Sequence, residues 1–358
     1  MAYGMVRVFA LILLILFTQA IAAEPQSVWS GVGRVVAIGD VHGDYTQFVK
    51  LLRAAGLIDE KDAWIGGKAH LVQTGDVLDR GPESRKVMDL LMRLERQARR
   101  AGGFTHALIG NHEAMNVYGD LRYVSEAEYA AFRDSNSEQL REAMYQQYAE
   151  ELRQSSSGQS LLALNDDHKR AWLSQHPLGY FEHRYAFGPK GKYGKWIRGH
   201  NVAVKINDIL FVHGGVSPKY AEASLDELNR RARQELDDFT KLKVGLVTDP
   251  EGPLWYRGLA DTDERLLEAH VNALQKSYGC SRIVIGHTVT AGTVMPRFSG
   301  KVVMIDVGLS SAYGGRLACL AFEEGNAYVL HRGQKLPLPM ERGERLIKYL
   351  ESAAALDH

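Results

Sequence analysis

Cysteine is nearly absent from this sequence, and positive and negative charges cancel. The 358 residues include only Cys280 and Cys319, too few for a disulfide-based scaffold, although export would permit one bridge between them. Lys and Arg together number 43, as do Asp and Glu. Proteins that coat nucleic acid are usually clearly basic, so we expect no nucleic-acid partner. A hydrophobic content of 45% predicts a packed core rather than a disordered chain.

Long hydrophobic runs are also scarce, and the most apolar one lies close to the N-terminus. Arg7 precedes the run Val8–Phe17, and small residues at Ala20, Ala22 and Ala23 precede Glu24. This order is typical of a cleaved signal peptide over residues 1–23, because the run is too short for an ordinary membrane span. We therefore expect an exported protein, periplasmic or secreted, with no stable membrane span after cleavage. An uncleaved anchor is the alternative. Residues 24–30 should form a flexible lead-in.

Three short apolar runs in the first third of the chain each lead into a polar motif. The runs are Val35–Ile38, His70–Gln73 and Thr105–Ile109. The motifs are Gly39-Asp40-Val41-His42-Gly43, Gly75-Asp76-Val77-Leu78-Asp79-Arg80-Gly81 and Gly110-Asn111-His112-Glu113. Helix-compatible sequence follows each motif, over residues 45–55 and 84–100 for the first two, with apolar residues every three to four positions. This order predicts α/β units whose loops bring ligands to one edge of a sheet.

The remainder of the chain predicts further elements of the same domain. A β-hairpin is expected over residues 202–206 and 209–212, ending at His213, and a strand over residues 282–285 leads to His287. Helices are expected near residues 224–239 and 263–278, and a loop over the Gly- and Lys-rich residues 187–195. The polar residues from about 125 to 176 form either a helical insertion beside the site or a solvated helical hairpin without a role.

We expect an α/β (α+β) fold with two packed β-sheets flanked by helices. One catalytic domain would cover residues 31–335 and include the helical insertion. Residues 336–358 would form a C-terminal tail with a short helix.

The polar motifs supply the ligands of a centre with two metal ions. Two cations about 3.5–4 Å apart can hold phosphate oxygens and acidify a water molecule. Such a centre needs one anionic ligand shared by both ions, together with imidazole and amide donors. Asp76, on the middle motif, is placed to be that bridge. The other expected ligands are Asp40, His42, Asn111, His213 and His287. Oxygen and nitrogen donors suit Mn, Fe or Zn, and we expect two divalent or transition metal ions, with Mn first.

Five motifs in this order resemble those of a known family. They are Gly-Asp-x-His-Gly, Gly-Asp-x-x-Asp-Arg-Gly, Gly-Asn-His-Glu, His-Gly-Gly and Gly-His-Thr. The set resembles the phosphoprotein-phosphatase branch of the calcineurin-like metallophosphoesterases. More closely it is similar to the Shewanella-like protein phosphatases, through Ala114-Met115-Asn116-Val117, Val204-Lys205-Ile206-Asn207-Asp208 and Asp306-Val307-Gly308-Leu309-Ser310-Ser311. The resemblance covers residues from about 34 to 320.

The resemblance implies a role for each residue. Asp40, His42 and Asp76 would hold one metal, and Asp76, Asn111, His213 and His287 the other. His112 would protonate the leaving oxygen, oriented by Asp79. Arg80 would grip a phosphate oxygen, and Arg257 is the candidate second phosphate arginine. Attack by metal-bound hydroxide would leave no phosphoenzyme. A cysteine nucleophile has no support, because glycine, not arginine, stands six positions after each cysteine.

The expected activity is hydrolysis of phosphomonoesters, with phosphate on protein Tyr, Ser or Thr as the leading substrate. Its partners would be a phosphorylated protein, a peptide or a small phosphoester. The alternatives are a dinucleoside-polyphosphate hydrolase of the diadenosine tetraphosphate type and a noncatalytic binding module. Three further assignments stay open. Asp306 could bond a ligand histidine or shape a turn, Glu113 could support a metal loop or start a helix, and Tyr118, Tyr123 and Tyr313 are expected to pack rather than line the pocket.

Overall fold

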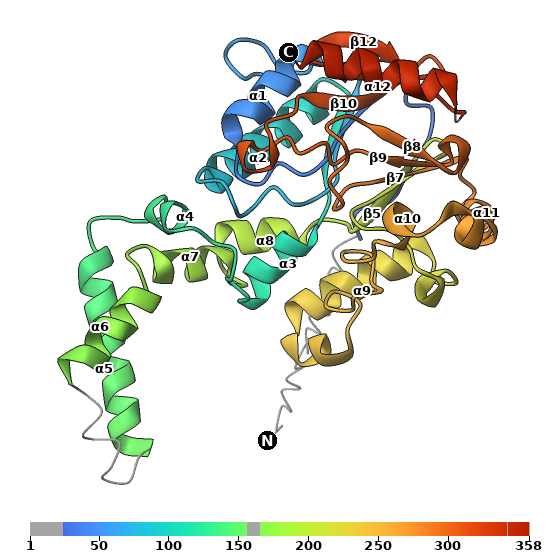
Figure 1. Ribbon diagram of the computed structural model, residues 1–358. Helices are drawn as coiled ribbons and strands as arrows, with labels where there is room; N and C mark the ends of the chain where they lie inside the picture. Colours follow the sequence, from blue (N-terminus) through green and yellow to red (C-terminus); the bar gives the residue numbers. More distant parts are fainter. Residues whose placement is uncertain (1–23, 156–164, 342, 358) are drawn as a thin grey trace, which may run out of the picture.

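The computed structural model describes residues 24–155, 165–341 and 343–357 (Figure 1). The expected signal peptide, residues 1–23, lies outside these ranges. Within them, no helix is long and apolar enough to cross a membrane.

Two mixed six-stranded sheets form the centre of the molecule. In spatial order, the first sheet contains β1 (Val28–Trp29), β5 (Ala203–Ile206), β6 (Ile209–Val212), β7 (Arg282–Ile285), β9 (Val302–Met304) and β8 (Met295–Arg297). The second contains β12 (Gln334–Pro337), β11 (Asn326–His331), β10 (Ala318–Glu323), β2 (Arg34–Ile38), β3 (His70–Gln73) and β4 (Phe104–Ala107). The sheets pack against each other, with the rings of Phe211 and Phe322 in edge contact between them.

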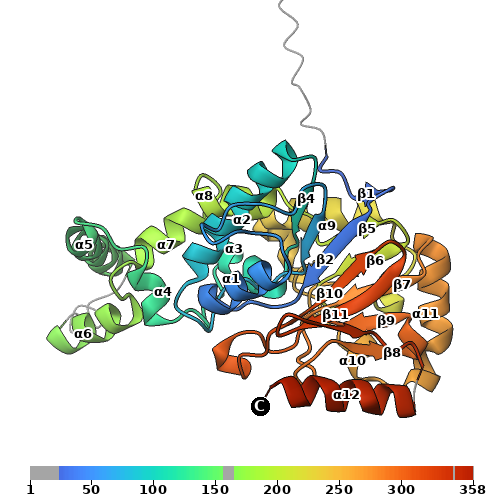
Figure 2. The same ribbon diagram turned by 90° about the horizontal axis from the view of Figure 1, so that it is seen from above.

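Helices flank both sheets. Figure 2 shows α1 and α2 on one flank and α11 on the other. The α-helices are α1 (Tyr45–Ala54), α2 (Ser84–Arg100), α3 (Asn111–Tyr118), α4 (Glu126–Ala130), α5 (Ser137–Ser155), α6 (Asp166–Gln175), α7 (Tyr180–Phe187), α8 (Lys192–Arg198), α9 (Leu225–Asp237), α10 (Gly258–Asp261), α11 (Glu264–Tyr278) and α12 (Glu344–Leu356). Helix α2 buries Val87, Leu90, Leu91 and Leu94, the apolar positions that its spacing predicts.

Most of the elements expected from the sequence are confirmed. Strands β3, β6 and β7 and helix α2 have the expected bounds, and β5 and β6 pair as the antiparallel hairpin. The two sheets flanked by helices are confirmed as well. Strand β12 ends at Pro337 and so crosses residue 336, the expected start of the C-terminal tail. Helix α12 packs against the domain, where the Tyr349 hydroxyl forms hydrogen bonds with Thr293 and Val294.

The loop expected over residues 187–195 is wrong in its second half. Helix α8 begins at Lys192 and buries Tyr193 and Ile197 in the main core, while Trp196 donates to the Glu95 carboxylate of α2. Gly194 lies inside this helix because a Cβ there would come within 2.1 Å of the Gly188 carbonyl oxygen. Tertiary packing therefore overrides the weak helix propensity of glycine.

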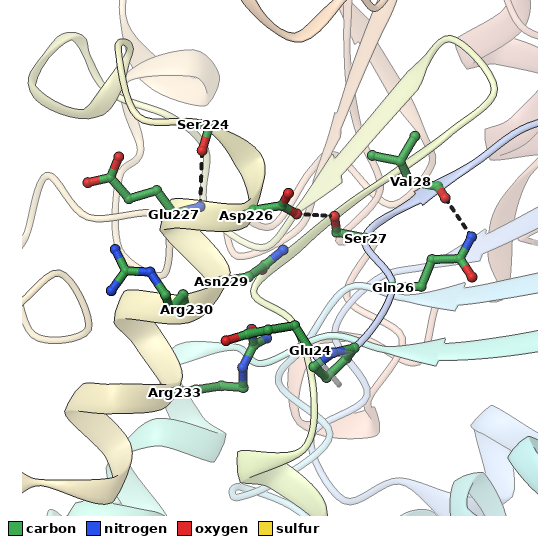
Figure 3. Close-up of a pocket in the computed structure, with 11 residues that line it drawn as sticks. Glu24, Gln26, Ser27, Val28, Ser224, Asp226, Glu227, Asn229, Arg230 and Arg233 are labelled. Carbon is green, nitrogen blue, oxygen red and sulfur yellow. Dashed lines mark hydrogen bonds and ion pairs between the residues drawn. The ribbon is translucent and has the colours of Figure 1, made fainter. Parts of the chain in front are cut away.

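The flexible lead-in expected over residues 24–30 is also wrong. Val28 and Trp29 form β1, which pairs in parallel with β5. Ahead of that strand, Ser27 donates to Asp226 and Glu24 pairs with Arg233, both on α9 (Figure 3). Figure 3 also shows the surface pocket that this segment and α9 enclose. Contacts with distant residues therefore hold a segment that has no strong local pattern.

The segment from 125 to 176 contains α4, α5 and α6 in its described part. Figure 1 shows α5 and α6 standing away from the sheets as an arm. The arm has a small core of its own, formed by Tyr145, Ala149 and Trp172. Helix α4, at the start of the segment, lies closer to the sheets.

Candidate metal centre

Strand ends bring the expected ligands together from both sheets. β2 and β3 are parallel neighbours in which Ile38 lies opposite Gln73, so the loops carrying Asp40 and Asp76 leave the same edge side by side. β6 and β7 are parallel neighbours in which Val212 lies opposite Ile285, so His213 and His287 do the same. The sequence predicts one ligand-bearing edge, but the ligands come from the carboxyl ends of parallel strands in two sheets, and the two edges meet at the site.

The backbone of these loops is strained where the expected site residues lie. Five non-glycine residues of the site have a left-handed backbone, with φ of 46° at His42, 57° at Asp76, 68° at Asp79, 70° at Arg80 and 65° at His287. Such conformations cost about 1–3 kcal/mol each and persist where the surrounding structure holds them. Close packing adds to the constraint, because a Cβ at Gly110 would lie 2.2 Å from Asp76 Oδ1.

Asp76 stands between two compact groups of ligand atoms. One group is His42, Asp76 and His112, and the other is Asp76, His213 and His287; the atoms of each lie within 4.8 Å of one another. In the first group His112 is the expected acid rather than a ligand, and the expected ligand Asp40 places Oδ2 3.9 Å from His42 Nε2. All five side chains of the two groups are buried. A carboxylate common to two such groups has the position of a bridging ligand.

In the second group, hydrogen-bond acceptor atoms face one another at short distances. His213 Nδ1 lies 2.9 Å from the Thr74 carbonyl oxygen, so this nitrogen is the donor and a metal would take the lone pair of Nε2. Nε2 lies 3.0 Å from Asn111 Oδ1, 3.1 Å from His287 Nδ1 and 3.3 Å from Asp76 Oδ2. Two oxygens with no proton to give thus face an acceptor nitrogen, the arrangement that a cation stabilises.

The remaining expected ligands also present atoms that can accept a metal ion. His42 Nδ1 donates to the Leu78 carbonyl oxygen at 3.0 Å, which leaves Nε2 free to bind a metal. Burial lowers the pKa of His42 to about 4 and, together with His213, the pKa of His287 to about 2. Both rings are therefore neutral near pH 7, as metal binding requires. His287 Nε2 and Asp40 Oδ2 are buried without a hydrogen-bond partner.

Carboxylates crowd this part of the site without a Lys or Arg beside them in the described part of the chain. Burial, with Asp306 and Asp76 nearby, raises the pKa of Asp40 well above its usual range. Burial also acts to raise the pKa of Asp76, but His213 and His112 outweigh it and hold that pKa well below its usual range. In the described part of the chain, no Lys or Arg forms an ion pair with Asp40 or Asp76. Divalent cations fit a set of donors that combines buried carboxylates with acceptor nitrogens.

His112 is the second residue of α3, and Asp79 orients its ring. Its Nδ1 lies 2.5 Å from Asp79 Oδ2, and Asn116 Nδ2 donates to the other Asp79 oxygen at 2.9 Å. Burial lowers the pKa of His112, but Asp76 and Asp79 outweigh burial and raise it to about 9. The ring is therefore protonated at neutral pH, with Nε2 turned toward Asp76, 3.8 Å from Oδ2. This is the state that a general acid needs.

The two expected phosphate arginines lie at the exposed rim. The Arg80 guanidinium lies 4.0 Å from the centre of the Tyr123 ring. Arg257 Nη1 donates to the His287 carbonyl oxygen at 2.8 Å and to Thr288 Oγ1 at 2.9 Å, which ties it to the second ligand group. Two of the tyrosines expected only to pack also reach this region. The Tyr123 ring lies 5.1 Å from His112, and the Tyr313 ring lies 5.1 Å from His42.

Glu113 supports the metal loop, which is the first of its two expected roles. Its carboxylate accepts the backbone N–H groups of Asp76 at 2.7 Å, Val77 at 2.9 Å and Gly110 at 2.8 Å. Asp306 does not bond a ligand histidine; its Oδ1 accepts the Gly308 N–H in a turn. Sequence reasoning assigned no role to Asn116, although its position one helical turn after His112 is a usable signal.

The two cysteines take no part in the site. Both are buried with free thiols, Cys319 on β10 and Cys280 just before β7. The bridge that export would permit is not formed.

Known proteins match this chain over most of its length. The sequence model of the calcineurin-like phosphoesterases matches residues 33–291. Shewanella-like protein phosphatase 2 of Arabidopsis thaliana is 30% identical over 282 residues, covering 77% of this chain and 71% of the relative. An uncharacterized protein of Schizosaccharomyces pombe is 32% identical over 306 residues, covering 82% and 78%.

A solved structure agrees with these sequences. The cold-active protein-tyrosine phosphatase of a psychrophilic Shewanella species superposes with a TM-score of 0.67 at 30% identity, covering 88% of this chain and 83% of that one. The chain therefore belongs to the calcineurin-like phosphoesterase family and, within it, to the Shewanella-like phosphatases, and is a hydrolase that acts on phosphoester bonds.

Proposed function

We propose that the protein is a dinuclear metal-dependent phosphatase that hydrolyses phosphomonoesters, with phosphate on protein side chains as its main substrate. The observation that carries the proposal is the position of Asp76, which is common to two separate groups of ligand atoms. His42 and Asp40 would complete one metal site, and Asn111, His213 and His287 the other. The nitrogen and oxygen donors suit Mn, Fe or Zn, and we propose Mn first.

When bound, two such ions would neutralise phosphate charge and lower the pKa of a water molecule. The chain's own residues would orient the phosphate and protonate the leaving oxygen. Arg80 and Arg257, at the rim, would orient the phosphate through their guanidinium donors. His112 Nε2–H would give its proton to the oxygen that leaves phosphorus, while Asp79 holds Nδ1 and stabilises the ring's charge. Water supplies the new oxygen on phosphorus, so the products are inorganic phosphate and the free hydroxyl.

The names of two relatives support a protein substrate. One is a Shewanella-like protein phosphatase and the other a protein-tyrosine phosphatase. The Tyr123 and Tyr313 rings beside His112 and His42 would give the substrate's leaving group an aromatic surround. We therefore propose phosphotyrosine ahead of phosphoserine and phosphothreonine.

A substrate panel tests this proposal. With Mn present, the mature protein should hydrolyse a phosphotyrosine peptide faster than a phosphoserine peptide of the same sequence. Both rates should exceed that on diadenosine tetraphosphate. A faster rate on diadenosine tetraphosphate would instead support the dinucleoside-polyphosphate alternative. A chain without any metal-dependent turnover would be the noncatalytic module.

We also propose that the protein acts outside the cytoplasm, in the periplasm or after secretion, on the basis of the Arg7 and Val8–Phe17 pattern. N-terminal sequencing of the mature protein should then begin at Glu24. A chain that keeps Met1 at its start would contradict cleavage.

A further inference from the structure

The turn that carries Asp79 and Arg80 needs support from outside itself. Both residues have a left-handed backbone, with φ of 68° and 70°. Residues with a Cβ rarely adopt this conformation, so the turn is not the one that these two residues prefer. The same turn aims Asp79 at His112 and Arg80 at the rim of the site.

The helical insertion supplies much of that support. The Asp79 N–H donates to Glu128 Oε1 at 3.1 Å, and the Arg80 N–H donates to the Tyr123 carbonyl oxygen at 3.4 Å. Tyr123 also places its ring against the Arg80 guanidinium. Residues 123–128, which span the start of the insertion, therefore hold both residues of the turn. Helices α5 and α6 stand apart from this contact.

Glu128 does more than cap its own helix. It closes a capping box with Ser125, in which its Oε2 accepts the Ser125 N–H at 3.0 Å. Its Oε1 instead reaches across 49 residues of sequence to the Asp79 N–H. The Ser84 hydroxyl also donates to Oε1 and accepts from Asp79 at 3.1 Å.

The burial of Glu128 is unusual for a capping residue. The side chain is 4% exposed, and no Lys or Arg forms an ion pair with it anywhere in the described ranges. A buried carboxylate without a cation is costly, and here three hydrogen-bond donors offset that cost. A capping glutamate at the surface would stabilise α4 without being buried. The burial of Glu128 is instead explained by its hydrogen bond to the turn that carries Asp79.

We propose that Glu128 is a positioning residue for leaving-group protonation: by holding the Asp79 N–H it fixes the left-handed turn, and so holds Asp79 against His112. This inference rests on the proposed role of His112 as the general acid. The metal ligands have separate support, because Glu113 and not Glu128 holds the Asp76 loop. Loss of Glu128 should therefore impair proton donation while leaving metal binding intact.

The leaving group provides the test. p-Nitrophenyl phosphate and phenyl phosphate have similar shapes, but p-nitrophenolate departs without a proton far more readily than phenolate. In the mature protein, Glu128→Ala should lower kcat on phenyl phosphate about tenfold or more, a part of the 10²–10⁴-fold that general acids supply. kcat on p-nitrophenyl phosphate should stay within about twofold. Glu126→Ala, an exposed position on the same helix, is the control and should change neither rate.

Three comparisons decide the outcome. The metal content of Glu128→Ala should match that of the wild type. Glu128→Gln keeps an acceptor for the Asp79 N–H and should recover part of the lost rate. If Glu128→Ala does not fold, Glu128→Gln takes its place in the test. Equal losses on both substrates, or no loss, would overturn the inference. His112→Asn is measured in parallel: if it shows the leaving-group dependence and Glu128→Ala does not, only the positioning role fails. If His112→Asn shows none, the proposed acid fails and the inference with it.

Discussion

Asp76→Asn should abolish phosphatase activity by lowering the affinity for both metal ions at once. The substitution keeps the size of the side chain but removes the single negative charge that stands in both ligand groups. Two bound ions would supply several kcal/mol of charge stabilisation, and each 1.4 kcal/mol is a factor of ten in rate. We therefore expect kcat on p-nitrophenyl phosphate to fall by about three orders of magnitude or more. Metal analysis of the purified variant should show both sites depleted.

The control is Asp167→Asn, the same chemical change on the exposed surface of α6. Among the described residues, the ion pair of Asp167 is with Arg170 one turn away, so activity and metal content should stay at the wild-type level. Asp76→Asn with wild-type turnover, or with one ion still fully bound, would contradict a shared ligand.

His112→Asn should have the second largest effect, and that effect should depend on the leaving group. Loss of a general acid costs about 10²–10⁴-fold where the leaving oxygen needs a proton. kcat on phenyl phosphate should fall by that range, and kcat on p-nitrophenyl phosphate by much less. His176→Asn, whose ring bonds a backbone carbonyl in the arm, is the matched control and should alter neither rate.

The pH dependence follows from the same group. Burial lowers the pKa of His112, but Asp76 and Asp79 outweigh it and raise it to about 9. An acid must be protonated to act, so the rate on phenyl phosphate should be maintained below this pKa and fall as pH rises through it. Cations bound at Asp76 would move the fall to lower pH. His112→Asn should lack this alkaline fall; a variant that keeps it would assign the fall to another group.

The centre of the fold was predictable because its signals are local. Strand β6 follows from an uninterrupted apolar run and helix α2 from helical spacing, and a motif at each strand end indicates where the ligands gather. Asp40 and Asp76 therefore share an edge of one sheet, and His213 and His287 share an edge of the other; that the two edges meet was not predicted. Within each sheet, their order along the chain was sufficient, because parallel strands of a sheet end on the same side.

The supporting contacts were not predictable, because they join residues far apart in sequence. Ser125 and Glu128 have the pattern of a capping box, which gives no sign that one carboxylate oxygen reaches Asp79. The N-terminal segment has no periodic pattern, yet β5 and α9 hold it. Helix α8 contains a glycine and forms because its aromatic residues pack on α2 and the core. In each case a tertiary partner decides the local structure.

The number of metal ions per chain tests the central claim most directly. Elemental analysis of the purified mature protein, saturated with Mn and freed of loosely bound metal, should give two ions per chain. The same measurement on Asp76→Asn should give a value near zero. One ion per chain in the wild type, or two that persist in Asp76→Asn, would contradict a dinuclear centre bridged by Asp76.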